Sequence, residues 1–294
     1  MPERLEHLST TDQVGAVAST DAASVGTFER WMSLPLLFPL IILVVLGLFW
    51  PTTLAMIETW QRSSTYEHCY FVIPAVIAIV WWHSRTAVPL KPYWPGLIPT
   101  AIAGLLWQVG NATGAAVVAQ LAVIGVIVAV ALTTFGLRWA RQMAFPLGFL
   151  FFAVPFGDEL LPVLIPLTAD VTVWALQLSG VPTYQYGSDF ITPNGRWSVV
   201  EACGGVRYLV AALVTSYVFV WMQPWTASKR ISFVLVALGL ALVANWVRTY
   251  AIVQANLSTD HNMVGWIIFG MAMFGLFYLG TRLDTVTNRV PSHI

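Results

Sequence analysis

The sequence predicts an all-α polytopic membrane protein with about eight transmembrane helices and a structured cap on the outer face. Of its 294 residues, 57% are hydrophobic and 10% are charged, and its mean hydropathy is +0.73. Soluble domains average about 45–50% apolar and roughly 25% charged residues. Apolar runs occupy almost all of the chain after Leu34 and leave no stretch long enough for a separate soluble core. We therefore expect one membrane domain over residues 31–285.

The two ends of the chain are expected to be cytoplasmic tails. Residues 1–30 are rich in Ser, Thr, Ala and acidic residues and have no apolar core, which predicts a disordered tail. Residues 286–294 follow the last apolar run and form a second, shorter tail. No small-residue cleavage site follows the first apolar run, so we expect this run to be retained as a signal anchor.

Eight apolar runs are candidates for transmembrane helices, although several are shorter than the roughly 20 residues that a helix needs to cross a bilayer. We expect flanking residues to complete the short runs, or the bilayer to thin around them. The eight runs are Leu34–Trp50, Cys69–Trp82, Gly96–Val109, Ala115–Gly136, Met143–Val154, Val206–Met222, Ile231–Ala255 and Val264–Gly280.

The positions of the basic residues orient these runs. With a cytoplasmic N-terminus, ten of the 14 lysines and arginines fall on the cytoplasmic side, as the positive-inside rule requires. Arg62 and Arg196 fall outside, and Arg207 and Arg248 lie near or within spans. The ten cytoplasmic residues are Arg4, Arg30, Arg85, Lys91, Arg138, Arg141, Lys229, Arg230, Arg282 and Arg289.

Residues 155–205 form the longest outer connection and are expected to be a periplasmic cap. Within it, residues 159–178 are apolar but are interrupted by Pro162 and Pro166, which predicts a helix lying along the membrane interface. Residues 190–193 and 196–200 then read as two strands joined by Asn194-Gly195. This dipeptide favours a two-residue hairpin with a type I′ turn, because it accepts positive φ angles.

Cys203 follows the hairpin in the segment Glu201-Ala202-Cys203-Gly204-Gly205-Val206-Arg207. We expect it at a helix N-terminus, where unpaired N–H groups and the helix dipole favour a thiolate. Arg207, four residues on, would share its helical face. Glu201 is included in the same candidate site. Two alternatives remain: a small buried thiol without chemistry, and a disulfide with Cys69, which begins the second span on the same side.

Arg248 lies late in the seventh span, about 26 Å along a helix from Ile231 and so close to the outer boundary of the membrane core. A cation at this depth either extends to the headgroups or has a functional partner. Asn245 lies one turn earlier on the same face. It is a candidate to hold the guanidinium or an oxyanion, and a bridge between helices is equally consistent with the sequence.

His261 precedes the eighth span and is the candidate base, because histidine exchanges a proton readily near neutral pH. A solvent-facing histidine beside a capping Asp260 is the alternative. Tyr66 and His68 form a second outer cluster before the second span. They are candidates to line the same cleft, and anchoring at the interface is equally consistent.

The motifs that the sequence lacks limit its chemistry. No H-E-x-x-H or C-x-x-C metal spacing, no phosphate-binding G-x-x-x-x-G-K-[ST] loop and no G-x-S-x-G elbow is found. We therefore expect no metal and no cofactor. No basic block of the length needed for nucleic acid occurs either.

Six segments after residue 55 resemble the exosortase family, membrane cysteine transpeptidases of Gram-negative bacteria related to the archaeosortases. The resemblance is nearest to the exosortase A-like group that sorts PEP-CTERM proteins. The segments are WQRSSTYEHCYFVIPAVIAIVWWHSR from Trp60, FPLGFLFFAVPFGDELLP from Phe145, TADVTVWALQLSGVPTY from Thr168, NGRWSVVEACGGVRYL from Asn194, NWVRTYAIV from Asn245 and DHNMVGW from Asp260.

This resemblance implies a nucleophile at Cys203, with Arg248 and His261 as the other members of a catalytic triad. It also implies an inner-membrane enzyme, active at the periplasmic face, that cleaves a C-terminal sorting tail through a thioacyl intermediate. Such a tail has a short motif such as Pro-Glu-Pro, a transmembrane helix and a basic end. The implied partners are proteins with this tail, membrane lipids and an unidentified acceptor, in systems linked to exopolysaccharide.

The sequence departs from the family pattern at two positions near these residues. Gly204 follows the cysteine where the family usually has serine, and Cys69 follows His68 where it usually has glycine. Two other functions are weighed against the transpeptidase. One is a transporter or flippase in which Arg248 and Arg207 bind an anionic headgroup. The other is a noncatalytic scaffold for polysaccharide assembly.

Overall fold

The computed structural model describes residues 36–84, 90–256 and 261–287, and it divides into two compact units. Unit 1 is Met1–Pro155 and unit 2 is Phe156–Ile294, so the division falls where the predicted cap begins. The predicted N-terminal tail lies outside the described residues. At the other end the last helix extends to Thr287, two residues into the predicted C-terminal tail, and residues 288–294 are not described.

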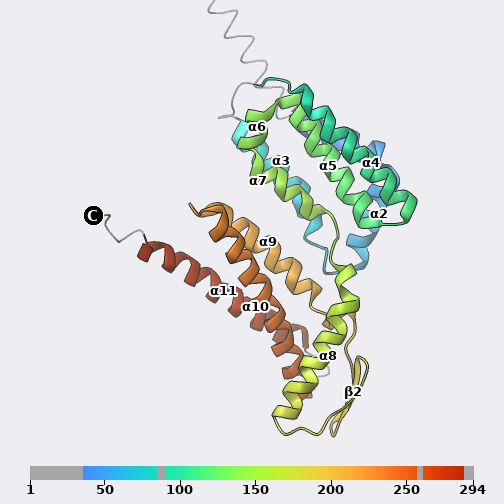
Figure 1. The fold of residues 1–294 in the computed structure, drawn as a ribbon, viewed down its shortest axis with the longest axis vertical. Helices are drawn as coiled ribbons and strands as arrows, with labels where there is room; N and C mark the ends of the chain where they lie inside the picture. Colours follow the sequence, from blue (N-terminus) through green and yellow to red (C-terminus); the bar gives the residue numbers. More distant parts are fainter. Residues whose placement is uncertain (1–35, 85–89, 257–260, 288–294) are drawn as a thin grey trace, which may run out of the picture. The chain divides into compact units, whose positions relative to one another are not determined.

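Unit 1 is helical, and its longest helices pack as a pair. Figure 1 shows α4 and α5 side by side. They approach closely because Gly110 lies against Ala119, where a Cβ on Gly110 would be 2.6 Å from the Ala119 backbone nitrogen. The elements are α1 (Leu36–Leu48), α2 (Trp50–Arg62), α3 (Cys69–Ser84), η1 (Trp94–Gly96), α4 (Leu97–Thr113), α5 (Ala116–Phe135), α6 (Leu137–Gln142), α7 (Ala144–Phe149) and η2 (Leu150–Ala153).

Unit 2 holds a second group of helices and a small sheet. Helix α10 packs against both α9 and α11, and α8 also packs against α10 (Figure 1). The elements are η3 (Asp158–Leu160), α8 (Leu161–Leu178), β1 (Tyr184–Tyr186), β2 (Asp189–Thr192), β3 (Gly195–Ser198), η4 (Glu201–Cys203), α9 (Val206–Met222), α10 (Ala227–Gln254) and α11 (His261–Thr287).

The structure does not confirm eight spans. Among the described residues, four helices are long and apolar enough to cross a membrane, and α1 with α2 is a fifth if this pair, bent by 97°, is one span. The shorter apolar helices Cys69–His83, Ala144–Ala153 and Val206–Met222 have 10–17 residues. At about 1.5 Å per residue they reach at most about 26 Å, less than a ~30 Å hydrocarbon core.

Helix α8 confirms that the segment with Pro162 and Pro166 is a helix. Pro162 lies in the first turn, where its missing N–H removes no intrahelical hydrogen bond. Pro166 lies inside the helix, which nevertheless continues to Leu178. With η3, this segment (Asp158–Leu178) is one of the four helices that are long and apolar enough to span a membrane.

The sheet confirms the two predicted strands but places their turn one residue earlier. In the antiparallel register Thr192 pairs with Gly195, so the turn residues are Pro193 and Asn194. Asn194 does not have a positive φ, and the predicted type I′ turn is therefore wrong. Pro193 fixes a negative φ and favours the second position of a turn that has glycine at its fourth. Strand β1 pairs with β2 to complete a three-stranded sheet.

Candidate functional site

Cys203 ends the short 3-10 helix η4 rather than starting α9. Gly205 is the N-cap of α9 and has a left-handed φ of +92°, so Cys203 lies two residues before the cap. The predicted helical face shared by Cys203 and Arg207 is therefore wrong, because no continuous helix joins them. The Cys203 side chain is half-buried and packs against a cluster that includes Ala169 of α8 and Phe190 of β2.

Asn245 of α10 attaches this segment to the helix bundle of unit 2. Its Nδ2 donates a hydrogen bond of 2.9 Å to the backbone carbonyl of Cys203. Asn245 is fully buried, and a Cβ on Gly205 would lie 3.0 Å from the same Nδ2. The glycine is therefore needed for the close approach. Asn245 acts here on the cysteine backbone, and it is the bridge between elements that the sequence left open as an alternative.

Gly204 fits the other side of the same segment against α8. A Cβ at this position would lie 2.8 Å from Cδ2 of Leu161 and 3.3 Å from Cγ1 of Ile165. The two glycines after the cysteine therefore let the chain pass between α8 and α10.

Arg248 is buried beside the cysteine segment. Its side chain is 4% exposed, whereas an arginine that reaches the headgroups would be exposed. Within the described part of the chain, its Nε and Nη1 atoms are buried and have no hydrogen-bond partner. Buried hydrogen-bond donors without an acceptor are costly, so the position favours a functional role over a structural one.

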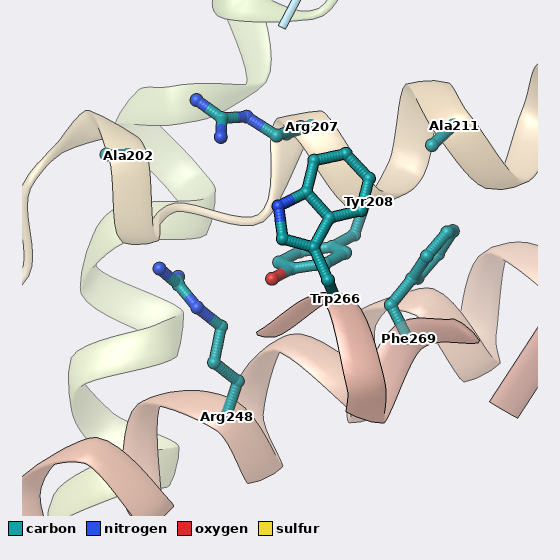
Figure 2. A pocket seen from close by; sticks show the side chains of 7 residues that line it. All are labelled: Ala202, Arg207, Tyr208, Ala211, Arg248, Trp266 and Phe269. Carbon is teal, nitrogen blue, oxygen red and sulfur yellow. The ribbon is translucent and has the colours of Figure 1, made fainter. Parts of the chain in front are cut away.

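A small pocket of about 40 Å³ opens next to Arg248 (Figure 2). Figure 2 shows the Arg248 side chain extending from α10 toward Ala202, with Tyr208 and Trp266 beside it. The guanidinium carbon lies 5.8 Å from the centre of the Tyr208 ring. The pocket thus combines two arginines with aromatic walls. Its lining residues are Ala202, Arg207, Tyr208, Ala211, Arg248, Trp266 and Phe269.

His261 is the first residue of α11, and its side chain and Asp260 both lie outside what the structure describes. Gly265 is one turn later on α11, and a Cβ there would lie 2.7 Å from Nε of Arg248. The first turns of α11 therefore pack against Arg248.

The remaining candidates are distributed over both units. Glu201 is exposed in η4 of unit 2. Tyr66 and His68 belong to unit 1, where Tyr66 is fully buried and the carbonyl of Thr65 lies 3.3 Å from His68 Nδ1. Burial lowers the pKa of His68 below its ordinary value of 6.5, and hydrogen bonds to the backbone partly oppose this effect.

Both cysteines are free thiols, so the structure does not contain the disulfide considered as an alternative. Cys69 is fully buried, and its Sγ donates a hydrogen bond of 3.3 Å to the carbonyl of Phe152. It therefore fits the description of a structural thiol. Among the described residues no group of three or more His, Cys, Asp or Glu side chains is arranged to bind a metal ion.

Sequence reasoning missed three residues of this site: Tyr208, Gly265 and Trp266. Tyr208 directly follows the candidate Arg207, and Gly265 is one helical turn after His261. Helical spacing could have placed Gly265 on the face of the histidine. Nothing in the sequence indicates that Tyr208 and Trp266 would meet across two helices.

Comparison with known families identifies the chain over most of its length. The family described as Transmembrane exosortase (Exosortase_EpsH) matches residues 60–278, which include the cysteine segment, Arg248 and His261. Neither the curated proteins nor the solved structures give a significant match.

Proposed function

Because the chain belongs to the transmembrane exosortase family, we propose that it is a membrane-embedded cysteine transpeptidase with Cys203, Arg248 and His261 as its catalytic residues. The observation that carries this proposal is the environment of Arg248. Nε and Nη1 of this buried cation have no hydrogen-bond partner among the described residues, and its side chain lines a pocket next to the cysteine segment. Asn245, one turn earlier on the same helix, holds the cysteine backbone.

The reaction follows from these groups. The Cys203 thiolate attacks the scissile carbonyl carbon, and the carbonyl electron pair moves to oxygen, where the Arg248 guanidinium stabilises it. The tetrahedral intermediate then collapses. The C–N bond breaks, the leaving amine takes a proton from His261, and a thioester to Cys203 remains. An acceptor amine or hydroxyl then gives its proton to His261 and attacks the thioester carbonyl, the C–S bond breaks, and the Cys203 thiolate leaves. Water in place of this acceptor gives hydrolysis.

The substrate class rests on the family resemblance. The substrates are exported proteins with a C-terminal sorting tail of the PEP-CTERM type, cleaved at the periplasmic face of the bacterial inner membrane in systems that produce exopolysaccharide. The apolar character of the chain supports cleavage at the membrane.

A transporter or flippase is the second candidate, and one observation favours it. Arg207 and Arg248 line the same pocket, which suits an anionic headgroup as well as an oxyanion. Under this alternative the thiol only packs, so a Cys203→Ser protein would keep its function.

Coexpression with a tagged substrate tests the proposal. Cys203→Ala is expected to abolish processing of the sorting tail, because the nucleophile is lost. Cys69→Ala is the matched control: it removes a thiol that is buried and bonded to the Phe152 carbonyl, and it should leave processing intact. Intact mass spectrometry of the wild-type protein should detect a thioester between Cys203 and the substrate. Wild-type processing by Cys203→Ala would exclude the transpeptidase.

A further inference from the structure

Tyr208 is a second polar group of the pocket, and its ring is fixed on both sides. It lies in the first turn of α9, directly after Arg207. Its ring centre is 5.1 Å from that of Phe269 on α11, and the Arg248 guanidinium lies over the ring at 5.8 Å. These contacts hold the ring between α10 and α11. Both involve the ring rather than the hydroxyl group.

The hydroxyl lies where Arg248 meets α11. A Cβ on Gly265 would contact both the Tyr208 hydroxyl oxygen and Nε of Arg248, so these two polar atoms border the same small space. The side chain also lies within electrostatic range of Arg248, Arg207 and Cys203. A phenolic O–H among these groups can donate a hydrogen bond to an anion that forms beside the guanidinium.

We propose that Tyr208 is a further catalytic residue whose hydroxyl donates a hydrogen bond to the oxyanion of the tetrahedral intermediate. This inference rests on the transpeptidase function proposed above. When the Cys203 thiolate forms the C–S bond, the carbonyl electron pair moves to oxygen, which then accepts hydrogen bonds from Tyr208 and Arg248. On collapse the pair returns to form the C=O bond, the amine leaves with a proton from His261, and Tyr208 keeps its own proton throughout.

A purely structural role makes a different prediction. If Tyr208 served only as a surface for Arg248 and Phe269, its ring would be sufficient and the hydroxyl dispensable. Tyr208→Phe keeps the ring and removes the oxygen, so it separates the two roles. Tyr217→Phe is the matched control, because this half-buried tyrosine lies on the same helix, about 13 Å further along.

The experiment measures processing kinetics for the full-length protein in membranes with a tagged substrate. Tyr208→Phe is expected to lower kcat by about 10²–10³-fold with little change in KM, the usual effect of losing one oxyanion donor. Tyr217→Phe should match the wild type. Replacing Tyr208 with 4-aminophenylalanine, which restores a donor at the same place, should recover part of the loss.

Three results bear directly on the inference. Wild-type kcat for Tyr208→Phe, with Cys203→Ala inactive, would overturn the role of Tyr208 and leave the transpeptidase standing. Processing by Cys203→Ala would remove the transpeptidase itself. If Tyr208→Phe is inactive but does not accumulate in the membrane, the 4-aminophenylalanine protein decides: an accumulated protein with near-wild-type activity supports the donor, and an accumulated protein without activity excludes it.

Discussion

Arg248 combines deep burial with hydrogen-bonding groups that have no described partner. Each unsatisfied buried donor costs about 1–3 kcal/mol, and two of its donors are in this state. Packing alone gives no reason to keep such a residue. The proposed catalytic role explains the burial, because the anionic partner of Arg248 would be the oxyanion, which forms only during the reaction.

We expect Arg248→Met to separate activity from stability. The substitution keeps an apolar chain of similar reach and removes the uncompensated charge, so processing should be lost while the apparent Tm rises by a few degrees. The measurements are substrate processing and thermal unfolding in detergent.

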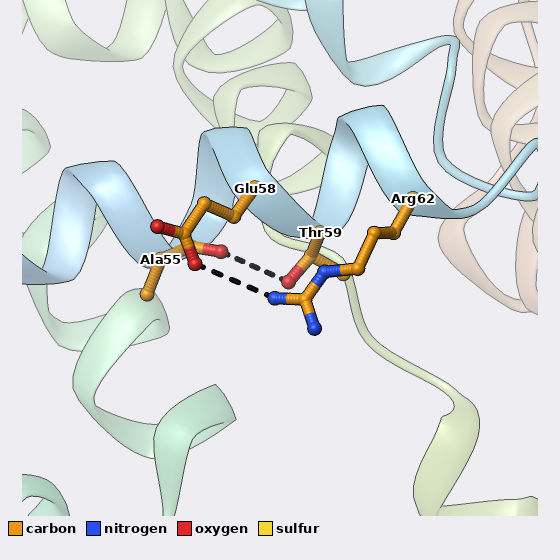
Figure 3. A network of polar contacts seen from close by, with 4 residues as sticks. All are labelled: Ala55, Glu58, Thr59 and Arg62. Atoms are coloured by element: carbon orange, nitrogen blue, oxygen red, sulfur yellow. Dashed lines mark hydrogen bonds and ion pairs between the residues drawn. The ribbon is translucent and has the colours of Figure 1, made fainter.

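Arg62→Met provides the control for that prediction. Arg62 is exposed on α2 and pairs with Glu58 at 3.4 Å, beside the Thr59 hydrogen bond to the Ala55 carbonyl (Figure 3). Exposed pairs contribute only about 0–1 kcal/mol, so both measurements should stay close to the wild type. A marked fall in Tm for Arg248→Met would show that the guanidinium has a stabilising partner.

His68 should make the stability of the protein depend on pH. Its pKa in the folded state is lowered by burial, so the unfolded chain binds its proton more readily. The contribution of His68 to folding stability is therefore fully present above the ordinary pKa of about 6.5 and is lost as pH falls from there through the lowered pKa of the folded state.

Thermal unfolding between pH 7.5 and 5.5 tests the titration of His68. The fall in Tm on acidification should be smaller for His68→Gln than for the wild type. The difference between the two proteins isolates this residue from the other histidines. Identical pH dependences would mean that His68 takes up its proton without cost in the folded state.

Single residues could be selected from the sequence where a reactive or charged side chain occurs within an apolar segment. Cys203 and Arg248 could be selected because a thiol and a cation are conspicuous in apolar segments. Tyr208 could not be selected, because tyrosines are common near span ends. Its importance comes from Gly265 and Phe269, which approach it from another helix. Such contacts are set by helix packing rather than by local sequence.

At the scale of elements, glycine determines how closely α11 approaches the site. Gly265 lies against Arg248 and Tyr208, whereas a Cβ added to Gly270 or Gly275 on the same helix would meet nothing within 4 Å. Of the four glycines of α11, Gly265 is therefore required by packing at the site, Gly280 packs away from it against Phe233 and Phe219, and the other two have open space.

Gly265→Ala should consequently damage the site, and Gly270→Ala should not. The added methyl group must displace Arg248 and Tyr208, so we expect destabilisation of about 1–3 kcal/mol and loss of processing. Gly270→Ala should leave processing unchanged and stabilise the helix by up to about 1 kcal/mol. Equal behaviour of the two variants in unfolding and processing assays would contradict the close approach of α11.

The elements that the sequence predicted well are those decided by local patterns. The 20-residue apolar run of α5 and the strands around Asn194 formed as expected. The predicted turn failed where two local rules competed, because Pro193 outweighed the preference of Asn194-Gly195 for a type I′ turn. The count of eight spans is not confirmed because several apolar runs form helices of only 10–17 residues.

At the scale of the whole molecule, the distribution of charge predicts the sidedness of the site. The hairpin and Cys203 lie at one end of α9, and Lys229 with Arg230 follows its other end. If α9 crosses the membrane, the positive-inside rule puts the lysine–arginine pair in the cytoplasm and the cysteine segment outside. The helix has only 17 residues, so it reaches about 26 Å. A crossing therefore requires flanking residues or a locally thinner bilayer.

Cysteine labelling in intact cells tests this sidedness. In a background lacking Cys69 and Cys203, a membrane-impermeant maleimide should label Ser188→Cys, in the β1–β2 connection, without permeabilisation. It should label Ser228→Cys, beside Lys229, only after the membrane is opened. Labelling of both positions from outside would mean that α9 does not cross, and a periplasmic active site could not then be inferred from charge.

Glu159→Cys extends the same measurement to α8. It distinguishes a helix that lies along the outer interface from a helix that crosses the membrane. The acidic residues at its start favour a helix that lies along the outer interface, so we expect the maleimide to label Glu159→Cys from outside, like Ser188→Cys. A helix of this length is also able to cross. In that arrangement the two ends of α8 lie on opposite sides, and Glu159→Cys would be labelled only after permeabilisation. The three positions together therefore decide whether α8 and α9 cross the membrane.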